Sequence, residues 1–225
     1  MSNSTKSVHV DVVSDVMCPW CYIGKRRLED AIKKLENIEV DIHWRPFQLD
    51  PTLPPEGRDR REYLETKFGG PERADQIYQQ IEQAGREEGL KFNFADIAVS
   101  PNTIDAHRVI RWSINEGKDV HDRLVESLFK LFFMEGGHIG KHNVLVKAAA
   151  DAGMDGSIVE ALLATDQDKQ EVTQEIAVAQ QMGVSGVPCF IIDNKYAVMG
   201  AQSALNIAEA ITQAAKESGD ANGSN

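Results

Sequence analysis

The chain has 225 residues, 42% of them hydrophobic, which is enough for one large domain or two closely packed ones. Its formal net charge of -11 argues against nucleic acids and anionic membrane surfaces as partners. The apolar runs are far shorter than the ~18 residues of a membrane span, and residues 1–7 lack the features of a secretory signal. We therefore expect a soluble, cytoplasmic protein.

The chain opens with a predicted strand that leads directly into a helix. Residues 8–16 are rich in valine, whose branched side chain is stiff at χ1 and suits a pleated strand. Apolar residues then recur at about the helical period of 3.6 residues, from Ile23 to Leu35. Pro19 fits the first helical position, because an N–H there would have no partner within the helix.

Two cysteines, Cys18 and Cys21, flank the start of this helix, separated by Pro19 and Trp20. Cys18 precedes the first helical residue, where unpaired N–H groups and the helix dipole favour a negatively charged atom. We expect it to attack a disulfide sulfur, and Cys21, one turn later, to resolve the mixed disulfide. Trp20 is interpreted either as a shield over this pair or as an ordinary half-buried aromatic residue.

A lone CxxC pair is also compatible with half of a zinc site or with a structural disulfide. A zinc knuckle needs a second ligand pair at matching spacing, and only Cys189 and six scattered histidines remain. A structural disulfide is not expected without a secretory signal. The sequence therefore favours redox chemistry and predicts no metal site.

A second strand is predicted over residues 39–49, and the intervening helix should return it parallel to the first. Pro46 marks an edge or an exit of that strand. A proline-rich loop follows at residues 50–58, and residues 95–101 are expected to form a loop or a short extended piece. The helices expected between the second strand and the end of this block are residues 62–68, 71–88, 103–116, 120–134, 141–152, 155–164 and 168–182.

Strand patterns return near the C-terminus, where residues 189–192 and 196–199 predict a β-hairpin. An amphipathic helix is expected over residues 204–216, with a disordered tail over residues 217–225. The order of elements predicts an α/β fold with a discontinuous domain (residues 8–49 and 183–216) and an inserted helical domain (residues 50–182). It also brings the Cys18 turn and the Val187-Pro188 turn to one end of the sheet.

Four motifs resemble the DsbA family of the thioredoxin superfamily, and within it the FrnE-like branch. They are residues 18–24 (CPWCYIG), 45–47 (RPF), 102–108 (NTIDAHR) and 186–188 (GVP). This branch is related to 2-hydroxychromene-2-carboxylate isomerases and kappa-class glutathione transferases. The resemblance covers residues 8 to about 214. It implies a thioredoxin-like fold with a large all-helical insertion, and thiol–disulfide exchange with protein or small-molecule thiols.

By the same resemblance, Pro188 would be a cis-proline facing the disulfide, and the Val187 backbone would pair with an extended substrate segment. His107 would lie near the site, as an accessory residue or as an ordinary satisfied side chain. Cys189 is interpreted as a third thiol near the site or as a small hydrophobic residue that opens a strand.

The chain also departs from the family pattern. Val12 stands where thioredoxins and DsbA keep a buried acid, and the nearest acids are Asp11 and Asp15. The related isomerases and transferases have serine at the position of Cys18, so two cysteines favour redox chemistry. Two alternatives stay open: a glutathione-dependent isomerase or transferase, and a redox-regulated binding module. No cofactor is expected beyond the redox-active disulfide, with glutathione as a candidate co-substrate.

Overall fold

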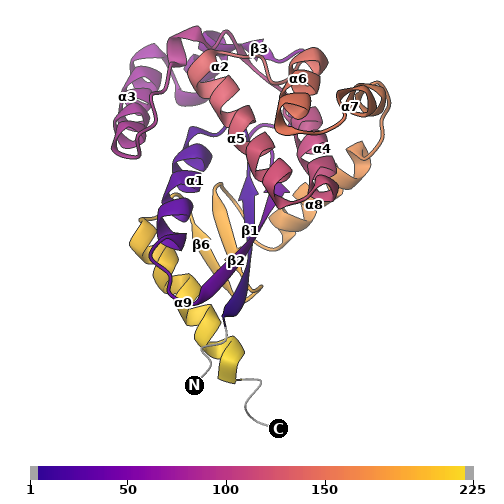
Figure 1. Cartoon of the computed structure of the whole chain (residues 1–225). Helices are drawn as coiled ribbons and strands as arrows, with labels where there is room; N and C mark the ends of the chain where they lie inside the picture. The colour runs from indigo at the N-terminus through magenta and orange to yellow at the C-terminus, as the bar shows by residue number, and fades with distance from the viewer. Residues whose placement is uncertain (1–4, 221–225) are drawn as a thin grey trace.

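A four-stranded mixed sheet organises the fold in the computed structural model, which describes residues 5–220 (Figure 1). Its strand order is β2-β1-β5-β6. The strands are β1 (Lys6–Ser14), β2 (Ile38–Pro46), β5 (Cys189–Ile192) and β6 (Tyr196–Met199). β1 runs parallel to β2 and antiparallel to β5, so the expected parallel return of the second strand and the hairpin are both confirmed.

Two helices, α1 (Pro19–Ile32) and α9 (Ala204–Asp220), cover one face of this sheet. Alternate residues of β1 point toward them, and Val8, Val10 and Val12 are almost completely buried. α9 is longer than expected, because the helix continues through residues 217–220. The prediction of a disordered tail is therefore wrong for those residues, and residues 221–225 lie outside the described part of the chain.

The insertion between β2 and β5 is helical, as predicted, apart from a short two-stranded ladder that the sequence did not indicate. The ladder pairs β3 (Arg58–Asp59) with β4 (Val99–Ser100). The helices are α2 (Arg60–Phe68), α3 (Pro71–Glu87), α4 (Ile104–Ser113), α5 (Lys118–Glu135), α6 (His142–Ala152), α7 (Gly156–Leu163) and α8 (Lys169–Gln181), with 3-10 turns at Phe94–Asp96 and Ile114–Glu116. Among the described residues, no helix is both long and apolar enough to cross a membrane.

One continuous hydrophobic core joins the insertion to the sheet domain. Tyr22 of α1 stacks on Phe129 of α5, with ring centroids 5.0 Å apart and ring planes 7° from parallel. Trp44 of β2 meets the same Phe129 ring edge-on at 6.1 Å. The insertion therefore packs directly on the helix that carries the cysteines. The division into two domains stays a prediction.

The NTIDAHR motif has a structural role through Arg108, which is completely buried. Its guanidinium donates to the backbone carbonyls of Leu162, in the last turn of α7, and of Thr165 and Gln167, just after α7, at 2.7–2.9 Å. It also pairs with Asp105 at 2.8 Å. These bonds satisfy carbonyls that a helix end leaves without partners, and they attach α7 to α4.

A cluster of charges completes the contact between α1 and α5. Glu126 of α5 accepts from Arg26 and from Lys25, the latter at 2.8 Å, and the Tyr22 hydroxyl donates to it at 2.8 Å. Burial alone would raise the pKa of Glu126, but the hydrogen bonds from Arg26 and Lys25 lower it to about 2. The ionised carboxylate is therefore strongly preferred in the folded protein.

We predict that Glu126→Gln lowers the free energy of unfolding by about 1–2 kcal/mol at pH 7. This is less than the full pKa shift would imply, because solvent screens a partly exposed carboxylate. The pKa of Glu126 lies below its ordinary value of 4.5 when folded, so its contribution is complete above pH 4.5 and lost as the pH falls toward 2. Urea unfolding at several pH values tests this. Glu135→Gln, in an exposed pair with Lys130 on the same helix, should change stability by less than about 0.5 kcal/mol.

Candidate redox site

The junction between β1 and α1 places Cys18 at the N-terminus of the helix. Cys18 is the N-cap residue, with extended backbone angles (φ -92°, ψ 114°), and Pro19 follows in the first turn. The Cys18 N–H donates to the Asp15 carbonyl at 2.9 Å, and the Cys21 N–H donates to the Cys18 carbonyl at 3.0 Å. The first turn carries no acidic residue. The positive end of the helix therefore faces the Cys18 sulfur without a competing anion from the first turn of α1 itself.

The two thiols of this turn differ in their surroundings. Cys18 is 4% exposed, and its Sγ lies 3.7 Å from the Val187 carbonyl, which accepts from the thiol. Cys21 is completely buried beneath it. Burial raises the pKa of Cys21 well above its ordinary value, and the neighbouring Cys18 sulfur raises it further. Cys21 therefore holds its proton firmly, while Cys18 is the thiol at the helix end.

Ser14, the last residue of β1, lies next to the Cys21 thiol. Its hydroxyl and the Asp15 backbone N–H both lower the pKa of Cys21, against the larger effect of burial. The same hydroxyl is buried and has no hydrogen-bond partner of normal geometry within residues 5–220. It is therefore free to turn toward the Cys21 sulfur.

Pro188 packs against α1 on the opposite side of the turn, and the Val187–Pro188 peptide bond is cis. The contact depends on Gly24: a Cβ at this position would lie 2.8 Å from the Pro188 Cγ and 3.2 Å from the Phe190 ring. Such distances are far below normal carbon contacts. Gly24 is thus the residue that lets the helix approach the proline segment closely enough to bring Val187 to Cys18.

Trp20 is 37% exposed, whereas the neighbouring Pro19 is buried. The indole therefore forms apolar surface immediately beside the less buried of the two thiols. Both interpretations of Trp20, as a shield of the thiol pair and as a half-buried aromatic residue, are compatible with this position.

Asp15 is a completely buried carboxylate within the same turn. Its Oδ2 accepts from the Leu49 N–H at 2.8 Å, and its Oδ1 accepts from the Met17 N–H at 3.3 Å. His107 of α4 lies 3.6 Å from Oδ1 and 2.9 Å from the Phe47 carbonyl, through its Nε2. Asp15 and His107 thus connect three segments: the cysteine turn, the chain that leaves β2, and the insertion.

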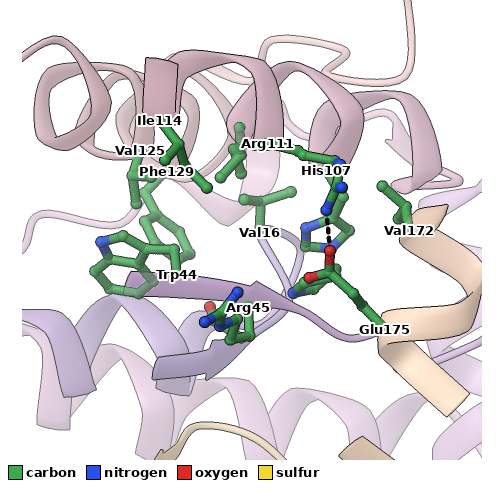
Figure 2. Close-up of a pocket in the computed structure, with 13 residues that line it drawn as sticks. Val16, Trp44, Arg45, His107, Arg111, Ile114, Val125, Phe129, Val172 and Glu175 are labelled. Atoms are coloured by element: carbon green, nitrogen blue, oxygen red, sulfur yellow. Dashed lines mark hydrogen bonds and ion pairs between the residues drawn. The ribbon is translucent and has the colours of Figure 1, made fainter. Parts of the chain in front are cut away.

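His107 and Ser14 also line a small cavity between β2 and the insertion. Figure 2 shows its walls, with Trp44 and Arg45 from β2, Arg111 from α4, and Glu175 from α8. Arg111 and Glu175 form an ion pair across it. The cavity volume of about 20 Å³ matches one water molecule. His107 is therefore a buried, bonded residue behind the cysteine turn.

Cys189 lies outside the apolar cluster that contains Cys18 and Cys21. It belongs to a second apolar cluster with Val13, Phe47, Ala179 and Val184, separate from the core that holds Cys18 and Cys21. Burial raises its pKa. This position fits the interpretation of Cys189 as a small hydrophobic residue.

The insertion adds two residues that the sequence did not single out, Arg60 and Tyr78. Arg60 is buried, donates to the Tyr78 hydroxyl at 2.7 Å, and both line a cavity of about 440 Å³. Burial raises the pKa of Tyr78, Arg60 lowers it, and the charge of Cys18 raises it. The pair therefore lies within electrostatic reach of the cysteine turn. No local motif marks these residues, because α2 and α3 meet only in the folded chain.

The sheet, the dithiol turn at the start of α1, and the proline segment opposite it define a thioredoxin-fold protein with a helical insertion. The chain belongs to the DSBA-like thioredoxin domain family, whose model matches residues 9–212. It is 30% identical over 190 residues to the uncharacterized protein YwbO of Bacillus subtilis (strain 168), covering 83% of this chain and 87% of that protein.

Solved structures show the same fold. The probable DsbA oxidoreductase of Streptomyces coelicolor is 31% identical, with a TM-score of 0.85 over 92% of this chain and 89% of that one. A 2-hydroxychromene-2-carboxylate isomerase is 16% identical, with a TM-score of 0.69 over 94% and 98% of the two chains. The cytosolic disulfide reductase DsbM of Pseudomonas aeruginosa, solved with GSH, is 13% identical, with a TM-score of 0.57 over 84% and 89%. These last two resemblances concern the fold alone.

We predict that Gly24→Ala lowers the free energy of unfolding by about 1–2 kcal/mol, because the clash with Pro188 outweighs the ~1 kcal/mol that alanine gains inside a helix. Urea unfolding measures this. Gly186→Ala is the matched control, because a Cβ at Gly186 would meet nothing within 4 Å. Equal stability of the two variants would contradict the close contact.

We predict that Ser14→Ala slows the attack of Cys21 on a mixed disulfide at Cys18 about three- to tenfold near neutral pH, because the pKa of Cys21 rises further. Ellman's reagent measures this through its two successive releases of thionitrobenzoate. Stability should be unchanged or higher, because within residues 5–220 the buried Ser14 hydroxyl makes no hydrogen bond of normal geometry that the change would remove. Ser113→Ala, which removes a bonded buried hydroxyl in α4, should lower stability and leave the second release unchanged.

Proposed function

We propose that this protein is a thiol–disulfide oxidoreductase that exchanges disulfides with protein or small-molecule thiols through Cys18 and Cys21. One observation carries the proposal: a thiol at the N-terminus of α1 lies over a second, completely buried thiol whose pKa is raised. In such a pair, Cys18 at the helix end attacks the substrate disulfide, and Cys21 keeps its proton until it resolves the mixed disulfide.

In reduction, the Cys18 thiolate attacks one sulfur of a substrate disulfide, forms a mixed disulfide, and releases the other sulfur as a thiolate. Cys21 then loses its proton and attacks the Cys18 sulfur. The Cys18–Cys21 disulfide forms, and the second substrate sulfur leaves as a thiolate. The two released thiolates take up two protons, so the substrate gains two electrons that the dithiol has lost. The reverse sequence oxidises a substrate dithiol.

The surroundings of Cys18 fit a substrate that binds as an extended segment. The Val187 carbonyl lies beside the Cys18 sulfur, and the indole of Trp20 adds exposed apolar surface next to it. A substrate segment would pair with the Val187 backbone, in the manner of an added strand, and rest on Trp20.

Glutathione is our candidate small-molecule co-substrate, and the cytoplasm our proposed location. The support is the fold shared with the disulfide reductase DsbM, which is described as cytosolic and was solved with GSH. In a reducing compartment the resting form would be the dithiol. Cysteine at position 18 favours exchange over the isomerase or transferase chemistry of the related branch. We also prefer exchange to a role as a redox-regulated binding module.

We predict that Cys18→Ser abolishes the reduction of insulin by this protein with dithiothreitol as reductant, measured as turbidity. Cys21→Ser should instead trap a mixed disulfide between Cys18 and the substrate, visible by mass spectrometry under non-reducing conditions. Cys189→Ala is the control and should keep the activity. Full activity in Cys18→Ser would exclude the dithiol mechanism. If Cys18→Ser is inactive, the equilibrium of the wild-type Cys18–Cys21 couple against glutathione shows whether the protein acts as an oxidant or as a reductant.

A further inference from the structure

Two histidines and two aspartates form a square on one face of the sheet, far along β1 from the cysteine turn. His9 and Asp11 alternate on β1, Asp41 and His43 alternate on β2, and the parallel register pairs His9 with Asp41 and Asp11 with His43. Since side chains alternate between the faces of a strand, all four point away from the face on which Val8 and Val10 are buried.

The donor atoms of this square are close together. His9 Nε2 lies 3.1 Å from Asp11 Oδ1, and His9 Nδ1 lies 3.5 Å from Asp41 Oδ2. His43 Nε2 lies 3.0 Å from Asp41 Oδ2. One ligand atom each from His9, Asp11 and His43 can be chosen so that all three lie within 4.8 Å of one another.

These separations match the needs of a tetrahedral metal ion. Zinc binds imidazole nitrogen and carboxylate oxygen at about 2.0–2.2 Å, which places two ligands of a tetrahedron about 3.3–3.5 Å apart. The His9 Nε2–Asp11 Oδ1 separation of 3.1 Å is close to this spacing, and side-chain rotation, of His43 above all, would complete the set, whose three atoms lie within 4.8 Å of one another.

The backbone and the charges also suit a cation. His9 is fixed by two hydrogen bonds to Asp193: its N–H donates to the Asp193 carboxylate, and its carbonyl accepts from the Asp193 N–H, both at 2.8 Å. Arg45 pairs with the same Asp11 Oδ1 at 2.6 Å, so a metal ion at Asp11 would either displace this guanidinium or bind through Oδ2 after a rotation of the carboxylate. The side chains are between 12% and 53% exposed, so an ion can reach them from solvent.

We propose that His9, Asp11 and His43 bind a divalent transition metal ion, with zinc as the preferred ion, while Asp41 lies beside the site. Neutral imidazoles and carboxylates are the ligands of such sites. The bound ion links β1 to β2 and so braces the strand that ends at the cysteine turn. The sequence predicted no metal site, because these ligands come from two separate strands, unlike the CxxC and HxxxH spacings of local motifs.

Zinc also binds thiolates, so the test uses the full chain with Cys18→Ser and Cys21→Ser as the background protein. After treatment with EDTA and its removal, titration calorimetry with zinc chloride should give one equivalent bound, and zinc should raise the Tm. Adding His9→Gln and His43→Gln should weaken binding by about 100-fold or more and remove the rise in Tm. His138→Gln with His142→Gln, in the same background, is the matched control and should bind like the background protein.

Circular dichroism and the Tm without zinc establish that each variant is folded. If the double histidine variant does not fold, His43→Gln alone replaces it, and its zinc affinity should fall about tenfold. The proposal is overturned if the background protein shows no saturable binding of zinc, or if it and the ligand variants bind zinc equally. Cobalt substitution adds a spectroscopic check, since tetrahedral cobalt absorbs strongly in the visible range and six-coordinate surface binding does not.

Discussion

The contact between α1 and the Pro188 segment sets the geometry of the whole site. Because Gly24 has no Cβ, the helix lies directly against Pro188 and Phe190, and the Val187 carbonyl comes within 3.7 Å of the Cys18 sulfur. This brings together two pieces of chain that are 169 residues apart. The insertion, the hairpin and the helices on the sheet all hold this contact in place.

The insertion is part of that support. Tyr22, one residue after the second cysteine, stacks on Phe129, and Glu126 binds the cations of the same helix face. On the other side of the turn, Asp15 and His107 join the cysteine segment to α4 and to the chain leaving β2. The helix that carries the thiols is therefore held from both sides, which limits how its N-terminus can move relative to Val187. Such packing holds the backbone of the cysteine turn in place while the sulfurs exchange bonds.

Burial divides the chemistry between the two thiols. The same burial that raises the pKa of Cys21 leaves few polar groups to assist its deprotonation. Among the described residues, the Ser14 hydroxyl and the Asp15 backbone N–H are the groups that lower this pKa. The metal-ligand square on the opposite face of β1 is remote from this chemistry and concerns the stability of the strand pair.

Local sequence determined the strand of valines, the helix begun by Pro19, the cysteine pair, the parallel return and the C-terminal hairpin, because periodicity and proline act over a few residues. The sequence pattern predicted that the last helix ends at residue 216, but α9 continues through polar residues to Asp220. It could not place Asp15 in a buried network, Cys189 in a separate cluster, or Arg60 beside Tyr78. Only the tertiary structure decided these, since burial, pKa and hydrogen-bond partners depend on which distant segments pack together.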